Sequence, residues 1–163
     1  MKAVVLAAGE GVRLQPITAT RPKHLIRLGG KAVLEYCFDA LKASGIVEVV
    51  VVTHYMGDAI RQYFGDGERL GLKISYVEQT EMLGTGNAVS VVAPYVDDDF
   101  VLVYGDLLFA PEAVADVLRL RGSRSSEPPP QRAAKPETSL KLWTGMMPGT
   151  IGTEIPAART LST

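Results

Sequence analysis

A glycine-rich segment directly follows the first apolar run of the chain and has the residue types that bind phosphate. Gly9, Glu10 and Gly11 come after the run at residues 2–8, and Arg13 follows two residues later. Glycine lets a backbone approach a ligand closely, and successive N–H groups in such a turn form a nest for anions. The guanidinium of Arg13 adds a planar, permanent charge that matches phosphate oxygens. The segment therefore predicts a phosphate-binding loop; a tight turn with a solvated arginine is the alternative.

Two familiar phosphate-binding motifs are excluded by the residues of this loop. Leu14 stands where the dinucleotide motif G-x-G-x-x-G requires its third glycine. No Lys-Ser or Lys-Thr pair closes a P-loop. The loop is therefore not of the dinucleotide-binding or P-loop type.

Two later segments carry residues suited to a nucleobase and to a metal ion. Gln79 has an amide, which can both donate to and accept from a base edge. Gly84 and Thr85 stand at a predicted helix entry, where Thr85 is also an ordinary helix cap. Asp106 follows a predicted strand, and Mg²⁺ prefers few protein carboxylates together with phosphate oxygens and water. In isolation, an aspartate that only shapes a turn is the alternative for Asp106.

The overall composition limits the other classes of function. A formal net charge of −1 creates no field that attracts nucleic acid or an acidic membrane, and no apolar run approaches the roughly 20 residues that span a bilayer. The single Cys37 rules out an internal disulfide and a cysteine-based zinc cluster. His24 and His54 lie too far apart for metal-ligand spacing, and His24 is interpreted as a packing or surface residue. We expect a cytoplasmic protein without nucleic-acid or membrane partners.

The elements that must position these loops alternate between strand and helix. Expected strands cover residues 2–8, 47–53, 73–77 and 100–104. Expected helices cover residues 32–44, 57–64, 86–93 and 111–120; the first has Leu34, Cys37, Phe38 and Leu41 on one face and Gly45 as its stop. This alternation predicts an α/β fold, a Rossmann-like three-layer sandwich with a mostly parallel sheet. Ligands in such sheets bind beyond the carboxyl ends of the strands, where all three loops lie.

The composition changes after residue 120. Residues 121–163 hold six of the ten prolines and contain no Val, Asp, Phe or Tyr. They show no periodic pattern of a strand or long helix, which predicts an irregular or disordered tail. A sharper interpretation is that this tail is not native to the fold, for instance the product of a shifted reading frame. We therefore place the nucleotide-binding part at residues 1–120.

The glycine loop and the residues after it resemble the signature of a known enzyme family. Residues 6–18 read LAAGEGVRLQPIT, followed by RPKHL at 21–25 and GGKAVLEY at 29–36. Together they resemble G-x-G-x-R-L-x-P-x-T-x-x-x-P-K-x-L, then G-K-x-x-L-E-Y, of the sugar-1-phosphate nucleotidylyltransferases. Ala32 stands where the family often has Pro. Residues 79–88 resemble the family's Q-x-x-x-x-G-T-A-x-A with Gly86 in place of Ala, and Asp106 resembles its Gly-Asp metal site.

The resemblance implies a role for each matching position. It implies nucleotide contacts from Leu6, Ala8, Gly9, Gly11, Gln79, Gly84 and Thr85. Arg13 is the implied stabiliser of the departing pyrophosphate, Lys23 the implied contact of the α-phosphate, and Asp106 the implied ligand of Mg²⁺. The implied reaction is direct attack of a sugar 1-phosphate oxygen on the α-phosphorus of a nucleoside triphosphate, with dTTP or UTP favoured.

The resemblance covers only about the first 120 residues. Catalytic domains of the family continue with strands that hold the sugar and a second acidic metal ligand, for which the tail offers no candidate. We therefore expect a truncated fold, with activity impaired by truncation. The alternative, from another class, is a non-catalytic nucleotide- or sugar-phosphate-binding regulatory subunit. Retention of Arg13, Lys23 and Asp106 together favours the enzyme, and formation of a homo-oligomer is left open.

Overall fold

The computed structural model describes residues 1–80, 85–96, 99–119, 139–143 and 153–156, with the backbone alone at 85–86, 139–143 and 153–156. Its main sheet has six strands in the order β5-β4-β1-β6-β7-β8. The strands are β1 (Lys2–Ala7), β4 (Glu48–Thr53), β5 (Lys73–Glu78), β6 (Phe100–Tyr104), β7 (Ser139–Trp143) and β8 (Thr153–Pro156). The first four are mutually parallel, and β7 and β8 continue the sheet antiparallel.

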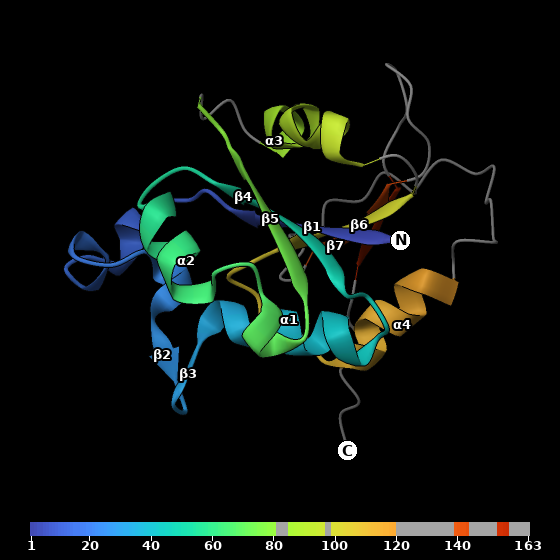
Figure 1. Ribbon diagram of the computed structural model, residues 1–163, viewed down its shortest axis with the longest axis horizontal. Helices are drawn as coiled ribbons and strands as arrows, with labels where there is room; N and C mark the ends of the chain where they lie inside the picture. The colour runs from blue at the N-terminus through green and yellow to red at the C-terminus, as the bar shows by residue number, and fades with distance from the viewer. Residues whose placement is uncertain (81–84, 97–98, 120–138, 144–152, 157–163) are drawn as a thin grey trace.

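Helices cover both faces of this sheet. Figure 1 shows α1, α2 and α4 on one face and α3 on the other. The α-helices are α1 (Val33–Ala43), α2 (Gly57–Phe64), α3 (Thr85–Val92) and α4 (Pro111–Arg119). Short 3₁₀ turns are η1 (Val12–Leu14), η2 (Ile17–Ala19), η3 (Lys23–Leu25), η4 (Glu68–Leu70) and η5 (Ala93–Tyr95), and β2 (Arg27–Leu28) pairs with β3 (Lys31–Ala32). The three-layer α/β architecture with a mostly parallel sheet is confirmed.

Two apolar clusters hold the layers together. Alternate residues of a strand point to opposite faces, so Ala3 and Val5 of β1 join the cluster beneath α1, α2 and α4. Val4 points the other way and joins the cluster beneath α3. Both faces of the central strands are therefore buried, which explains why β4 is a continuous apolar run.

The expected elements of the first 120 residues are confirmed to within two residues at each end. The predicted face of α1 is buried as a set: Leu34, Cys37, Phe38 and Leu41. The helix ends before Gly45, whose φ of 82° lies in the left-handed region that glycine adopts easily.

The expectation that no strand follows residue 120 is wrong. β7 pairs antiparallel with β6 and β8 pairs with β7. An open strand edge presents unpaired N–H and C=O groups to any nearby segment. Pairing of this kind depends on the edge that is available and not on a local hydrophobic pattern, so the composition of the tail did not reveal it. The domain boundary at residue 120 and the origin of the tail stay predictions.

Candidate functional site

The glycine loop between β1 and η1 folds around one carbonyl group. Gly11 has a φ of 69°, and its carbonyl oxygen accepts hydrogen bonds from the Leu14 N–H and from the Thr18 hydroxyl, both at 2.8 Å. Only glycine adopts this left-handed conformation routinely. Thr18 is 2% exposed, so this bond lies inside the loop.

The side chain of Lys23 runs across the glycine loop. A Cβ atom on Gly9 would lie 3.2 Å from Lys23 Nζ, and one on Gly11 would lie 3.2 Å from Lys23 Cβ. Contacts this short require glycine, unless the lysine moves. The two glycines therefore let the ammonium group reach the carboxyl end of the sheet, and Pro22, with extended backbone angles, leads into the turn that starts this approach.

Lys23 and Asp106 meet, although they are 83 positions apart in the sequence. Lys23 Nζ lies 2.5 Å from Asp106 Oδ2, and the two side chains are 20% and 37% exposed. Such partly exposed pairs contribute little to stability. The pair matters here because it joins the glycine loop to the end of β6.

Gly105 places Asp106 at this point. Its N–H donates to the carbonyl oxygen of Leu6 at 2.9 Å, which extends the pairing of β6 with β1 by one residue. A Cβ on Gly105 would lie 3.0 Å from Leu34 Cδ1, 3.1 Å from Val5 Cγ1 and 3.2 Å from the Leu6 carbonyl oxygen. Glycine therefore permits the close packing that carries the aspartate to the lysine.

His24 lies buried beside this ion pair. It is 1% exposed, and within the described residues its Nδ1 atom has no hydrogen-bond partner. Burial, reinforced by the positive charge of Lys23 and opposed by Asp106, lowers the pKa of His24 to about 4. The imidazole is therefore neutral at pH 7, as expected for a packing residue.

Arg13 lies on η1 with its side chain exposed. Within the described part of the chain, no acidic side chain or carbonyl group holds its guanidinium. It is therefore a charged fork available to a ligand beside the glycine loop. Lys31, by contrast, is bonded to Asp39 at 2.7 Å on the surface.

The other predicted nucleotide contacts surround the same end of the sheet. Leu6 is half-buried near the end of β1 and Ala8 is buried just beyond it. Gln79 follows β5 and is 3% exposed. Its side-chain Nε2 donates to Asn87 Oδ1 at 2.8 Å, and His54 Nδ1 lies 2.7 Å from its backbone carbonyl oxygen. Gly84 lies outside the described residues, and Thr85 is described only as the first residue of α3.

Two residues with positioning contacts were missed from the sequence as site residues. Thr18 belongs to the quoted signature, and its hydroxyl bond to Gly11 depends on loop geometry that spacing does not give. Asn87 stands eight positions after Gln79 on α3, and their contact depends on the angle of helix to strand. The sequence itself shows only a polar residue a few positions after its partner: Thr18 after Gly11, and Asn87 after Gln79.

Asp106 supplies a single carboxylate for the implied Mg²⁺. No group of three or more His, Cys, Asp or Glu side chains suited to a metal gathers within the described ranges. One partly exposed carboxylate still fits Mg²⁺, because this ion takes most of its ligands from phosphate and water when it accompanies a nucleotide.

Burial raises the pKa of Cys37, so that thiol is not a nucleophile at neutral pH.

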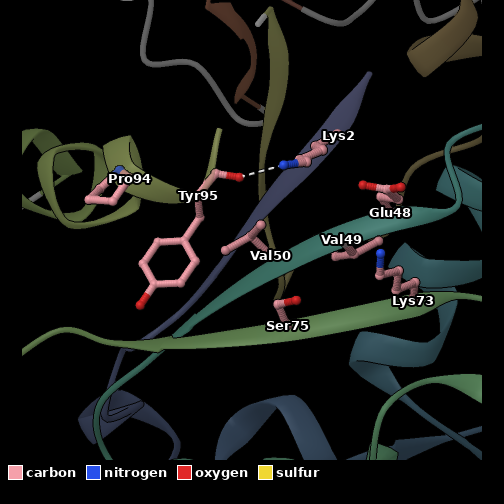
Figure 2. Close-up of a pocket in the computed structure, with 8 residues that line it drawn as sticks. All are labelled: Lys2, Glu48, Val49, Val50, Lys73, Ser75, Pro94 and Tyr95. Carbon is pink, nitrogen blue, oxygen red and sulfur yellow. Dashed lines mark hydrogen bonds between the residues drawn. The ribbon is translucent and has the colours of Figure 1, made fainter. Parts of the chain in front are cut away.

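A small cavity lies at the opposite, amino-terminal edge of the sheet. Figure 2 shows Lys2, Glu48 and Lys73 on three neighbouring strands, with the Lys2 ammonium bonded to the Tyr95 carbonyl at 2.8 Å. The cavity holds about 210 Å³, less than the 300–1,000 Å³ typical of ligand pockets. Glu48 lies between the two lysines and offsets part of their positive charge.

None of the described helices combines the length and apolar character that a bilayer crossing requires.

Comparisons with known proteins agree with this architecture. Residues 2–127 match the family model described as nucleotidyl transferase. A UTP–glucose-1-phosphate uridylyltransferase of Haloferax volcanii is 40% identical over 125 residues, which are 77% of this chain and 51% of that protein. A glucose-1-phosphate thymidylyltransferase of Streptomyces griseus is 39% identical over 143 residues, which are 87% of this chain and 37% of that protein.

A solved structure shares the fold. A Bacillus anthracis protein assigned as a glucose-1-phosphate thymidylyltransferase, in complex with a sucrose, is 28% identical with a TM-score of 0.67. The match covers 74% of this chain and 51% of that one. The chain thus spans about half the length, or less, of the relatives it matches.

Proposed function

Because the chain belongs to the nucleotidyl transferase family, we propose that its glycine loop binds a nucleoside triphosphate and that the protein transfers the nucleotidyl group to a sugar 1-phosphate. The observation that carries this proposal is the position of Lys23, which crosses the glycine loop and meets Asp106 at the carboxyl ends of β1 and β6. A cation is thereby held next to a loop suited to phosphate, at the edge of the sheet where ligands bind in such folds.

The reaction needs no nucleophilic side chain. An oxygen of the sugar phosphate forms a bond to the α-phosphorus, the bond from that phosphorus to the bridging oxygen breaks, and pyrophosphate leaves with the electron pair. The role of the protein is to align the two substrates and to offset their negative charge. Arg13 receives the charge of the departing pyrophosphate, and Lys23 contacts the α-phosphate.

Asp106 and Mg²⁺ share the remaining electrostatic task. When bound, Mg²⁺ neutralises phosphate charge and polarises the α-phosphate. Asp106 would hold this ion with one carboxylate, and the ammonium of Lys23, which offsets that carboxylate in the structure, would then be available to the nucleotide. The carboxylate and the ammonium would each exchange one partner for another of the same sign of charge.

The relatives guide the choice of substrates. Their names specify UTP with glucose 1-phosphate and thymidylyl transfer to glucose 1-phosphate. We therefore place UTP or dTTP and a glucose-type 1-phosphate first. A cytoplasmic location fits these substrates and the single buried cysteine. Assembly into a homo-oligomer stays a prediction.

Two measurements test the proposal. The first is titration calorimetry with UTP, dTTP, CTP and GTP in the presence of Mg²⁺, where we expect binding of UTP or dTTP in preference to the other two. The second is release of pyrophosphate with glucose 1-phosphate added. Absence of binding by all four nucleotides contradicts the proposal, whereas binding without release of pyrophosphate supports the regulatory alternative.

A further inference from the structure

Thr18 lies at the centre of the glycine loop, where its hydroxyl determines the direction of one peptide group. The Thr18 Oγ1 atom donates to the Gly11 carbonyl oxygen at 2.8 Å, and the Leu14 N–H donates to the same oxygen at 2.8 Å. A carbonyl oxygen has two lone pairs, and both are occupied here. The Gly11 carbonyl therefore points into the loop, toward Leu14 and Thr18.

The other polar group of this peptide is the Val12 N–H, which a ligand can contact. The bond between Gly11 and Val12 is trans, since the cis bond in this region is that between Gln15 and Pro16. In a planar trans peptide the N–H points away from the C=O. The Val12 N–H therefore points away from Thr18, out of the loop.

Val12 is part of a run of available donors. Within the described chain, none of the N–H groups of residues 9–13 donates to a protein acceptor. Backbone N–H groups require a partner, which here must be water or a ligand. Successive unpaired N–H groups in a glycine turn bind anions, and the ammonium of Lys23 lies close to Gly9 of the same turn.

Packing holds Thr18 in the orientation that makes this bond. The residue is 2% exposed, and its Cγ2 atom lies 3.0 Å from the position that a Cβ on Gly11 would take. The Tyr55 hydroxyl adds a longer contact of 3.4 Å to the Thr18 carbonyl oxygen, from the loop after β4. The Thr18 side chain is thus enclosed by the protein before any ligand arrives.

We infer that Thr18 is a positioning residue for triphosphate binding: its hydroxyl fixes the Gly11 carbonyl inward so that the Val12 N–H and its neighbours face the phosphates. This inference rests on the proposed function, because it assumes that the glycine loop receives a triphosphate. Without the hydroxyl, the Gly11 peptide retains only the bond from Leu14 and turns more freely. The free energy gained from the prearranged donors is then reduced.

The test separates the hydroxyl from the shape of the side chain. Thr18→Val keeps the shape and removes the hydroxyl, Thr18→Ser keeps the hydroxyl, and Thr18→Ala is a second removal in case the valine variant does not fold. Thr20→Val is the matched control, since Thr20 is an exposed threonine two residues further on. Each protein is labelled with ¹⁵N and titrated with inorganic tripolyphosphate and with UTP, both with Mg²⁺.

We expect wild type, Thr18→Ser and Thr20→Val to bind both probes with affinities within about threefold of one another. For Thr18→Val and Thr18→Ala we expect affinities about tenfold weaker, as one lost hydrogen bond and its positioning effect imply. The Val12 amide signal should shift strongly with tripolyphosphate in the first group and weakly in the second. The dispersion of the same spectra reports whether each variant is folded.

Three outcomes overturn the inference. Equal affinities and equal Val12 shifts across all variants overturn it and leave the proposed function intact. A loss of UTP affinity without a loss of tripolyphosphate affinity also overturns it, because the effect then lies at the base. Failure of the wild-type protein to bind either probe overturns both the inference and the proposed function.

Discussion

At the scale of single residues, the site depends on charges held close to a backbone that has no side chains in the way. Lys23 passes within 3.2 Å of where side-chain atoms on Gly9 and Gly11 would stand. Its ammonium is paired with Asp106, so the two charges offset each other before a ligand binds. A phosphate that binds to Lys23 must compete with the carboxylate of Asp106.

Removal of the Lys23 ammonium should impair turnover more than it impairs the fold. For Lys23→Ala we expect pyrophosphate release to fall by about 10²–10³, the usual cost of losing one electrostatic contact to the reacting group. Asp106 then also repels the phosphates, so nucleotide affinity should fall. Lys31→Ala, which removes a surface lysine paired with Asp39, should leave both unchanged. Unchanged turnover and affinity in Lys23→Ala would remove this lysine from the mechanism.

His24 should make the fold sensitive to acid. Its pKa is about 4 in the folded state and 6.5 in the unfolded chain, so between these values the unfolded state binds more protons. The free energy of unfolding is therefore unaffected by this group above pH 6.5. It decreases as the pH falls toward 4, by an amount on the order of 3 kcal/mol.

Urea unfolding at pH 7, 5.5 and 4 measures this loss. His24→Leu removes the titrating group and fills a similar volume, so its free energy of unfolding should fall less steeply over the same range. Equal slopes for the variant and the wild type would show that the histidine does not govern this acid sensitivity.

At the scale of elements, adjacent strands bring the separate motifs together. β1 ends in the glycine loop and β6 ends at Gly105-Asp106, and the two strands are neighbours in the sheet. The Gly105 N–H continues their pairing onto the Leu6 carbonyl. The position of Asp106 is therefore a consequence of how closely β6 approaches β1 and α1.

Gly105→Ala should disturb both stability and the site. The added methyl group meets the Leu6 carbonyl oxygen at 3.2 Å, and this backbone atom cannot move without shifting β1. We expect a loss of about 1–3 kcal/mol in urea unfolding, as for overpacked cores, together with weaker nucleotide binding. Asp106→Ala is the control: it should weaken binding at nearly unchanged stability. If Gly105→Ala is as stable as wild type, the packing argument is wrong.

At the scale of the whole molecule, the sheet extends beyond the part that forms the site. Every described site residue lies before residue 107, whereas β7 and β8 lie beyond the predicted boundary at 120. β7 covers the outer edge of β6 through the pairs Phe100 with Trp143, Val101 with Leu142 and Leu102 with Lys141. The tail therefore contributes to the sheet without contributing a described residue to the site.

A chain that ends at residue 138 tests this division of roles. With the edge of β6 exposed, the melting temperature should fall, by roughly 2–4 °C for each kcal/mol lost, and the tendency to associate should rise. At a temperature where the shortened chain is folded, its affinity for UTP should match that of the full chain. Lost affinity with an intact fold would mean that the tail supplies part of the site.

The amino-acid sequence by itself determined the order of the elements and the loops in which the site lies. β-Branched runs and helical periodicity are local properties, so β6 and α2 were predicted with their observed ends. Lys23 and Asp106 were indicated by the resemblance of the surrounding residues to the family signature, which is read along the chain without knowledge of the fold.

Only the tertiary structure decided which of these residues touch. The contact between Lys23 and Asp106, the bond from Thr18 to Gly11 and the pairing of β7 with β6 all depend on the direction in which one segment approaches another. The relative orientation of two segments results from how each packs against the whole sheet. A short stretch of sequence does not determine that orientation. The same reasoning applies to His24, whose burial follows from the elements that surround it.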